Sequence, residues 1–221
     1  MSEEFFRYKL GPGWIEVIVG CMFSGKTEEL IKQLKRAQYG RQALQVFKPK
    51  IDNRYSEANV ASHNKSMFPS EAVSSPFEIL SKIEKRTQVI GIDEGQFFDE
   101  DLIEVATVLA NNGKRVIVAG LDTDWKGRPF GNIPGLMAVA EVVRKQHAIC
   151  MVCGEPANRT QRLVAAEEDI LVGSTEAYEA RCRKHFDPEL SRRLAQVNKT
   201  NQAKQKESQN DRINETVEAH Q

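Results

Sequence analysis

The segment from Gly20 to Thr27 constrains the fold of this chain more than any other stretch. It reads Gly-Cys-Met-Phe-Ser-Gly-Lys-Thr, which is the P-loop pattern G-x-x-x-x-G-K-[ST]. Residues 14–19 before it are rich in β-branched side chains, and residues 28–36 after it carry apolar side chains at helical spacing. Strand, glycine-containing turn and helix follow one another as this motif requires, so the sequence predicts an α/β fold that binds phosphate groups at the turn.

The residue types of the loop suit phosphate binding. Gly20 and Gly25 let the backbone bend tightly and approach an anion without a Cβ in the way. The N–H groups of the loop and the positive end of the following helix then face the phosphates. We expect Lys26 to reach the β- and γ-phosphates and the Thr27 hydroxyl to bind Mg²⁺. The intervening residues of the loop are Cys21, Met22, Phe23 and Ser24.

Composition excludes several classes of protein. The chain has 221 residues, enough for one large domain with a small appendage. Lys plus Arg and Asp plus Glu each number 31, and a chain of zero net charge is a poor candidate for binding nucleic acid. The sequence has no apolar stretch long enough to span a bilayer and no signal-peptide pattern at its start, so we expect no membrane partner and a cytoplasmic location.

Apolar runs alternate with helical patterns after the P-loop. We expect strands at residues 43–48, 88–92 and 115–121, helices at 77–85, 99–112 and 134–144, and a polar loop at 49–76. This alternation predicts a parallel sheet, in which ligands bind beyond the carboxyl ends of the strands. Residues 146–186 carry a cysteine cluster, and the polar stretch from 188 to 221 is expected to be a mobile tail that is partly helical at 189–197.

Two acidic residues follow the predicted strand at 88–92. Asp93 stands where a Walker-B aspartate would hold Mg²⁺, directly or through water. Glu94 is the next residue, and side chains of successive strand residues point to opposite sides unless the strand end twists. One carboxylate can then serve the metal while Glu94 acts as a base toward a hydroxyl that attacks the γ-phosphate. A water molecule could be the acceptor instead, so these residues do not decide between a kinase and an ATPase.

A second motif combines three cysteines and one histidine. The ligands form two pairs, Cys150-x-x-Cys153 and Cys182-x-x-His185. Three thiolates and one imidazole suit tetrahedral Zn²⁺, and four protein ligands leave no open position, which favours a structural ion. A catalytic metal, a redox pair and buried free thiols are the alternatives. The stretch from 154 to 181 is longer than a zinc-finger loop, which indicates a ribbon with an inserted lid.

Five motifs in order give the chain a family resemblance. They are residues 20–27 (GCMFSGKT), 52–55 (DNRY), 91–98 (GIDEGQFF), 129–131 (PFG) and the Cys/His cluster. Together they closely resemble the cytosolic thymidine kinases shared by many bacteria and animals, over about residues 13–186. The resemblance implies a RecA-like α/β domain that binds ATP and a small zinc-ribbon or lasso domain whose loop closes over the nucleoside. It also implies transfer of the ATP γ-phosphate to the 5′-hydroxyl of thymidine, giving dTMP for DNA synthesis through nucleotide salvage.

The resemblance assigns roles to particular residues. Glu94 matches the general base for the 5′-hydroxyl. Further residues beside the phosphates are Asp52, Asn53, Arg54, Asp93, Gly95 and Gln96. The residues that match the nucleoside pocket are Met22, Phe97, Leu121, Trp125, Phe130, Thr160 and Tyr178. The backbone expected to bind the base belongs to Asp169, Ile170, Leu171, Val172 and Gly173.

The resemblance also implies an organisation and leaves alternatives. Domain boundaries are expected at residues 1–12 (lead-in), 13–146 (nucleotide-binding), 147–187 (zinc-binding with lid) and 188–221 (tail). The family commonly forms homotetramers and is inhibited by dTTP. Trp125 stands where the family usually has Phe, and His185 where other members can have Cys, which also binds zinc. Deoxyuridine or another pyrimidine nucleoside is an alternative substrate. A P-loop ATPase whose zinc ribbon binds nucleic acid or a protein is the alternative from another class.

Overall fold

The computed structural model describes residues 13–50, 59–61, 67–165 and 177–197. Its centre is a six-stranded sheet in the order β5–β2–β6–β7–β1–β8, and every neighbouring pair is parallel. The strands are β1 (Trp14–Val19), β2 (Leu44–Pro49), β5 (Glu71–Val73), β6 (Val89–Ile92), β7 (Arg115–Gly120) and β8 (Val142–Lys145). The predicted α/β fold around a parallel sheet is confirmed.

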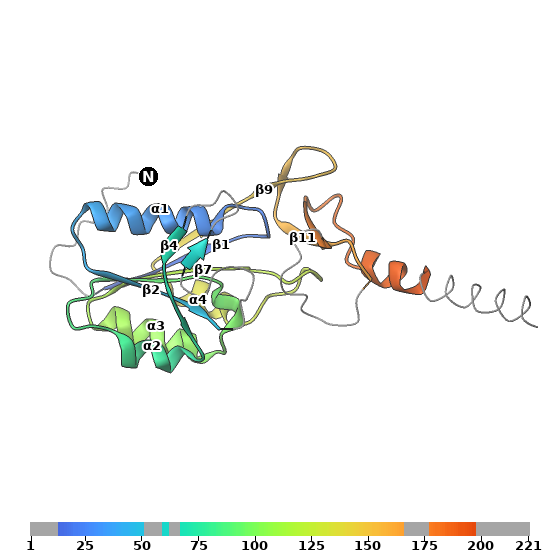
Figure 1. Ribbon diagram of the computed structural model, residues 1–221. Coiled ribbons are helices and arrows are strands. Elements are labelled where there is room, and N and C mark those ends of the chain that lie inside the picture. The colour runs from blue at the N-terminus through green and yellow to red at the C-terminus, as the bar shows by residue number, and fades with distance from the viewer. Residues whose placement is uncertain (1–12, 51–58, 62–66, 166–176, 198–221) are drawn as a thin grey trace, which may run out of the picture.

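Helices cover both faces of the sheet (Figure 1). Helix α1 (Lys26–Tyr39) lies on one face, and α2 (Pro76–Lys82), α3 (Asp101–Asn111) and α4 (Ile133–Val139) lie on the other. The strands alternate between these two layers: in β1, Val17 packs with the α3 side and Ile18 with the α1 side, and both are fully buried. Burial on both faces explains why these strands read as continuous apolar runs in the sequence.

Smaller strands surround the main sheet. Strands β3 (Asn59–Ala61) and β4 (Met67–Pro69) form one antiparallel pair. Strand β9 (Ala148–Ile149) pairs with β10 (Pro156–Ala157), and β11 (Arg159–Arg162) pairs with β12 (Tyr178–Arg181). We call residues 148–162 and 177–186, which carry these last two pairs, the ribbon; it lies at one end of the main sheet (Figure 1).

The described start of the polar tail contacts the chain just after β11. Residues 190–197 are helical, as expected for part of this stretch. The Ser191 hydroxyl is buried and donates a hydrogen bond to the Val164 carbonyl at 2.7 Å. Gln161 exchanges two hydrogen bonds with the backbone of Asp187, which ties the residue directly before the tail to β11.

Two expectations about secondary structure are wrong in part. The helix expected over 134–144 ends at Val139, since Ala140 has extended backbone angles, and residues 142–145 pair with β1 as edge strand β8. Between them the Glu141 carboxylate accepts a hydrogen bond from the Ile15 N–H at 2.7 Å. The expected loop at 49–76 contains β3, β4 and β5, whose three residues each are too few for a periodic pattern to show.

Within the described residues, no helix combines the length and the apolar character that crossing a membrane requires.

Candidate active site

The P-loop joins the carboxyl end of β1 to the first turn of α1. Gly20 and Gly25 have φ angles of 150° and 80°, a region that favours glycine. A Cβ on Gly20 would lie 2.5 Å from the Gln146 carbonyl oxygen, so residues that follow β8 press against the start of the loop. The Lys26 ammonium donates a hydrogen bond to the Cys21 carbonyl at 2.9 Å and therefore lies over the loop.

Asp93 follows β6 and faces the P-loop. The Thr27 hydroxyl lies 3.3 Å from the nearer carboxylate oxygen of Asp93. Burial raises the pKa of Asp93 to about 7; the charge of Glu94 adds to this shift, and the charge of Lys26 opposes it. A hydroxyl and a carboxylate are the hard oxygen ligands that Mg²⁺ prefers, so the pair fits the metal that accompanies a nucleotide.

Glu94 lies in a turn rather than on a strand. Its φ and ψ angles are 52° and 39°, a left-handed conformation that costs non-glycine residues energy and concentrates at functional sites. The turn leaves Glu94 half-buried while Asp93 is buried. Gln96 donates a hydrogen bond from Nε2 to the Glu94 carboxylate at 2.5 Å and accepts one at Oε1 from the Leu121 N–H at 3.0 Å. The buried Gln96 side chain thus links the ends of β6 and β7.

Asn132, which the sequence did not single out, supports this turn. Its side-chain amide is buried and lies within hydrogen-bond distance of the carbonyls of Gly95, Phe98 and Asp99, at 2.9, 2.8 and 3.0 Å. The backbone carbonyls after Glu94 are therefore held by a residue from the start of α4. The signal was present in the sequence, since Asn132 follows the Pro-Phe-Gly motif directly.

The residues expected around the nucleoside lie on several elements. Phe97 and Phe130 pack edge to face, with ring centroids 6.2 Å apart. Phe97 also borders a cavity of about 370 Å³ formed with Pro49, Lys50 and their neighbours. The Trp125 ring lies 5.0 Å from the fully buried Arg162 guanidinium.

Two further expected pocket residues, Thr160 and Tyr178, belong to the ribbon. Tyr178, on β12, is opposite Arg162 on β11. Thr160 is buried, and its hydroxyl accepts a hydrogen bond from the Met22 N–H at 3.0 Å. The structure thus brings Thr160 next to the P-loop.

Two more charged residues lie at this rim and were not predicted. Lys48, at the carboxyl end of β2, is 4% exposed, and Asp122, after β7, is 5% exposed. The Lys145 ammonium lies 2.7 Å from the Asp122 carboxylate. A charged residue at or shortly after the carboxyl end of an apolar strand is the signal that could have found both, because ligands bind at the carboxyl ends of such strands.

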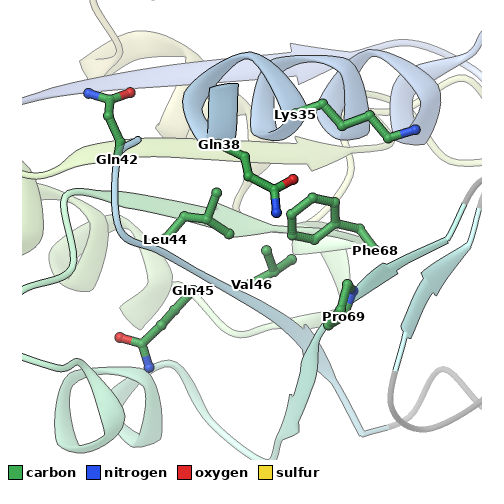
Figure 2. Close-up of a pocket in the computed structure, with 8 residues that line it drawn as sticks. All are labelled: Lys35, Gln38, Gln42, Leu44, Gln45, Val46, Phe68 and Pro69. Atoms are coloured by element: carbon green, nitrogen blue, oxygen red, sulfur yellow. The ribbon is translucent and has the colours of Figure 1, made fainter. Parts of the chain in front are cut away.

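A larger groove lies away from these residues (Figure 2). It measures about 490 Å³ and is lined by Lys35, Gln38, Gln42, Leu44, Gln45, Val46, Phe68 and Pro69. These come from the end of α1, the start of β2 and from β4, at the opposite end of the sheet from the P-loop. None of the predicted site residues within the described ranges borders this groove.

The three cysteines and His185 converge on one point. Their ligand atoms lie within 4.8 Å of one another. Cys153 Sγ and Cys182 Sγ are 3.8 Å apart, and His185 Nδ1 is 3.8 Å from Cys150 Sγ and 3.3 Å from Cys182 Sγ. A tetrahedral zinc ion about 2.3 Å from each sulfur places two sulfurs about 3.8 Å apart, so the donor set and its spacing fit zinc.

The thiol of Cys150 has a lowered pKa, which favours metal binding. Burial opposes ionisation, but hydrogen bonds from the N–H groups of Cys182, Val152 and Cys153, together with His185, lower the pKa of Cys150 to about 5. The thiolate is the form of cysteine that binds a metal.

Some predicted site residues lie outside the described residues. They are Asp52, Asn53 and Arg54 beside the phosphates and Asp169, Ile170, Leu171, Val172 and Gly173 beside the base.

The fold and the site define a class of protein. A parallel sheet, a P-loop at the end of β1 and acidic residues at the end of β6 are the parts of a P-loop nucleotide-binding protein, here with a Cys₃His centre attached. The family model described as thymidine kinase matches residues 13–186. A protein named thymidine kinase from Bdellovibrio bacteriovorus is 55% identical over 190 residues, which cover 86% of this chain and 92% of that protein. The chain belongs to the thymidine kinase family, and it is an ATP-dependent phosphotransferase.

Proposed function

We propose that the protein transfers the γ-phosphate of ATP to the 5′-hydroxyl of thymidine and forms dTMP for DNA synthesis by salvage. The observation that carries this proposal is a P-loop facing an acidic strand end within the stretch, residues 13–186, that the thymidine kinase family model matches. Deoxyuridine, which lacks only the methyl group of the thymine ring, is a second expected substrate.

The chain's own residues account for the steps of the transfer. The P-loop N–H groups and Lys26 bind the phosphates and place the γ-phosphate at the rim of the sheet. Thr27 and Asp93 would hold Mg²⁺, which neutralises charge on the β- and γ-phosphates when it is bound. Glu94 takes the proton from the 5′-hydroxyl as the oxygen attacks, and Gln96 orients its carboxylate through the 2.5 Å hydrogen bond.

The nucleoside is proposed to bind between the end of the sheet and the ribbon. Phe97 and Phe130 offer an apolar wall, and the Trp125 ring packs against the Arg162 guanidinium. Met22, Leu121, Thr160 and Tyr178 complete the proposed pocket, with backbone of residues 169–173 binding the base. Asp52, Asn53 and Arg54 are proposed to lie beside the phosphates, where a positive charge stabilises the transferring group.

The remaining organisation is also proposed. Residues 13–146 form the nucleotide-binding domain and 147–187 the zinc-binding domain with its lid, between the lead-in at 1–12 and the tail at 188–221. Zinc is structural, because four protein ligands close its coordination shell. A cytoplasmic location agrees with three cysteines kept reduced for a metal. A homotetramer and inhibition by dTTP complete the proposal.

A coupled assay tests the activity. The purified protein is mixed with ATP and Mg²⁺, and ADP release is measured with each of a panel of nucleosides, with DNA, and with neither. We expect release that depends on thymidine and, more weakly, on deoxyuridine. ADP release that needs no nucleoside, or that DNA stimulates, would instead support an ATPase with a binding ribbon. Metal analysis of the same sample measures zinc per chain.

A further inference from the structure

The P-loop is packed into the core of the ribbon. Cys21, the second residue of the loop, is fully buried and forms a hydrophobic cluster with Ala148, Cys150, Ala157 and Ala180. Its Sγ lies 3.5 Å from the Ala157 carbonyl oxygen. Burial raises the pKa of the Cys21 thiol, so the side chain packs as a neutral group. A residue of the phosphate-binding loop therefore belongs to the same core as the proposed metal ligand Cys150.

A hydrogen bond makes a second connection between the P-loop and the ribbon. The Met22 N–H donates to the Thr160 hydroxyl at 3.0 Å, and the Thr160 side chain is 3% exposed. Because the accepting hydroxyl is buried on a strand, this bond fixes the direction of the Met22 peptide group. Within the described residues, Thr160 supplies the hydroxyl for this N–H from a strand that lies 138 positions further along the chain.

Each of these connections leads to one pair of metal ligands. Ala157 in β10 pairs with Ala148 in β9, and β9 runs directly into Cys150. Thr160 in β11 pairs with Ala180 in β12, and β12 ends directly before Cys182. The two strands that hold the loop are therefore each paired with a strand that a metal ion would anchor.

We propose that the Cys₃His ribbon holds the P-loop in its phosphate-binding shape, with Thr160 as a positioning residue for the ATP phosphates. Metal binding and nucleotide binding are then coupled, and the coupling acts in both directions because linkage between two sites is reciprocal. The inference deepens the proposed function: it gives Thr160 a task toward ATP besides its expected place beside the nucleoside.

Measuring nucleotide affinity in the absence of nucleoside tests whether Thr160 positions the P-loop. Calorimetry measures ADP affinity for the zinc-loaded wild type, Thr160→Val and Thr160→Ser; the valine has nearly the same shape but accepts no hydrogen bond. We expect Thr160→Val to weaken ADP binding about fivefold, the effect of losing one hydrogen bond, and Thr160→Ser to restore it. Because no nucleoside is present, lost contacts to thymine do not contribute.

Thr107→Val is the matched control for the substitution. Its hydroxyl bonds to the Ile103 carbonyl within α3, on the opposite face of the sheet from α1, so ADP affinity should stay unchanged. Equal ADP affinity in wild type and Thr160→Val would overturn the positioning role.

The rate of zinc loss to a chelator tests the coupling from the other side. ADP should slow zinc release from the wild type, and it should protect Thr160→Val less, while zinc content at the start is the same. If Thr160→Val does not fold, zinc release from the wild type is measured with and without ADP. Equal release rates in the two conditions overturn the proposal. Failure of the proposed function would look different, because ADP protection would persist while thymidine was not phosphorylated.

Discussion

At the scale of single residues, the acidic strand end shows how backbone shape separates two neighbouring carboxylates. Asp93 directly follows β6 and is buried toward Thr27, whereas Glu94 turns into a left-handed conformation and stays half-buried. Burial and the charge of Glu94 raise the pKa of Asp93. Two adjacent acids thus occupy different environments, which is the arrangement that lets one serve a metal and the other a proton.

Replacing Glu94 tests its proposed role as the base. Glu94→Gln should bind ADP with nearly wild-type affinity, because the P-loop is unchanged, and should lower kcat on the order of 100- to 10,000-fold, since an amide cannot accept the proton. Steady-state kinetics with ATP and thymidine, together with ADP calorimetry, measure both effects. Glu100→Gln, a change of an exposed neighbour, is the control and should leave kcat unchanged. A kcat near that of wild type in Glu94→Gln would show that another group takes the proton.

At the scale of secondary-structure elements, one buried glutamate joins β1, β7 and β8. Glu16 on β1 accepts hydrogen bonds from Arg115 of β7 at 2.7 Å, Arg144 of β8 at 3.3 Å and Trp14 at 2.7 Å. Arg115 also donates to Gln33 of α1 at 3.0 Å. Glu16 is buried, with 3% of its surface exposed. Its two arginine partners come from β7 and β8, so the network joins β1 to the strand on each side of it.

Glu16→Gln should destabilise the fold in a pH-dependent way. Burial alone would raise the pKa of Glu16, but Arg115, Trp14 and Arg144 hold it below the ordinary value of 4.5. The stabilisation is therefore present above pH 4.5 and is lost as the pH falls through the lower folded-state pKa. Urea unfolding at pH 7 should show a loss of about 2 kcal/mol in the variant, because both arginines lose a buried partner.

The control for this prediction is an exposed glutamate. Glu104→Gln on α3 changes the same chemical group at the surface and should leave the unfolding free energy nearly unchanged. The difference between wild type and Glu16→Gln should shrink when unfolding is repeated below pH 4.5. A difference that stays constant with pH would mean that packing, rather than charge, explains the loss.

At the scale of the whole molecule, the ribbon has little hydrophobic core of its own. Its buried cluster consists of small side chains and cysteines, and it includes Cys21 from the P-loop. A structural metal commonly orders such a segment. The Cys/His cluster also joins both ends of the stretch that is proposed to close over the nucleoside.

Cys182→Ser tests the structural metal. Changing groups beyond the ligands already costs about 10- to 100-fold in metal affinity, so losing a ligand should cost more than about 100-fold. We expect the variant to lose zinc and to show a higher KM for thymidine or an unfolded ribbon, measured by metal analysis, kinetics and circular dichroism. Met151→Ser changes an exposed residue between two ligands and should keep the metal. Zinc content and kinetics equal to wild type in Cys182→Ser would contradict a structural role.

Local patterns were enough to predict most of the main sheet. Strands β1, β2, β6 and β7 and helices α1, α2 and α3 lie within a few residues of the positions expected from apolar periodicity. Strand β8 was missed because its four residues follow a short helix, and apolar spacing over the combined stretch imitates one longer helix. Its partner, β1, lies more than a hundred positions earlier in the chain.

The sequence by itself determined the groups from which the proposed chemistry is built: a P-loop turn, two acids after a buried strand, and three cysteines and a histidine in two pairs. Each of these depends on residues close together in the chain. Tertiary structure alone decided that Glu94 leaves the strand direction, that Lys48 and Asp122 are buried at the rim, and that Thr160 holds Met22. These features join segments that lie far apart in the sequence. No local spacing encodes such a contact, because it forms only when the packed sheet brings the segments together.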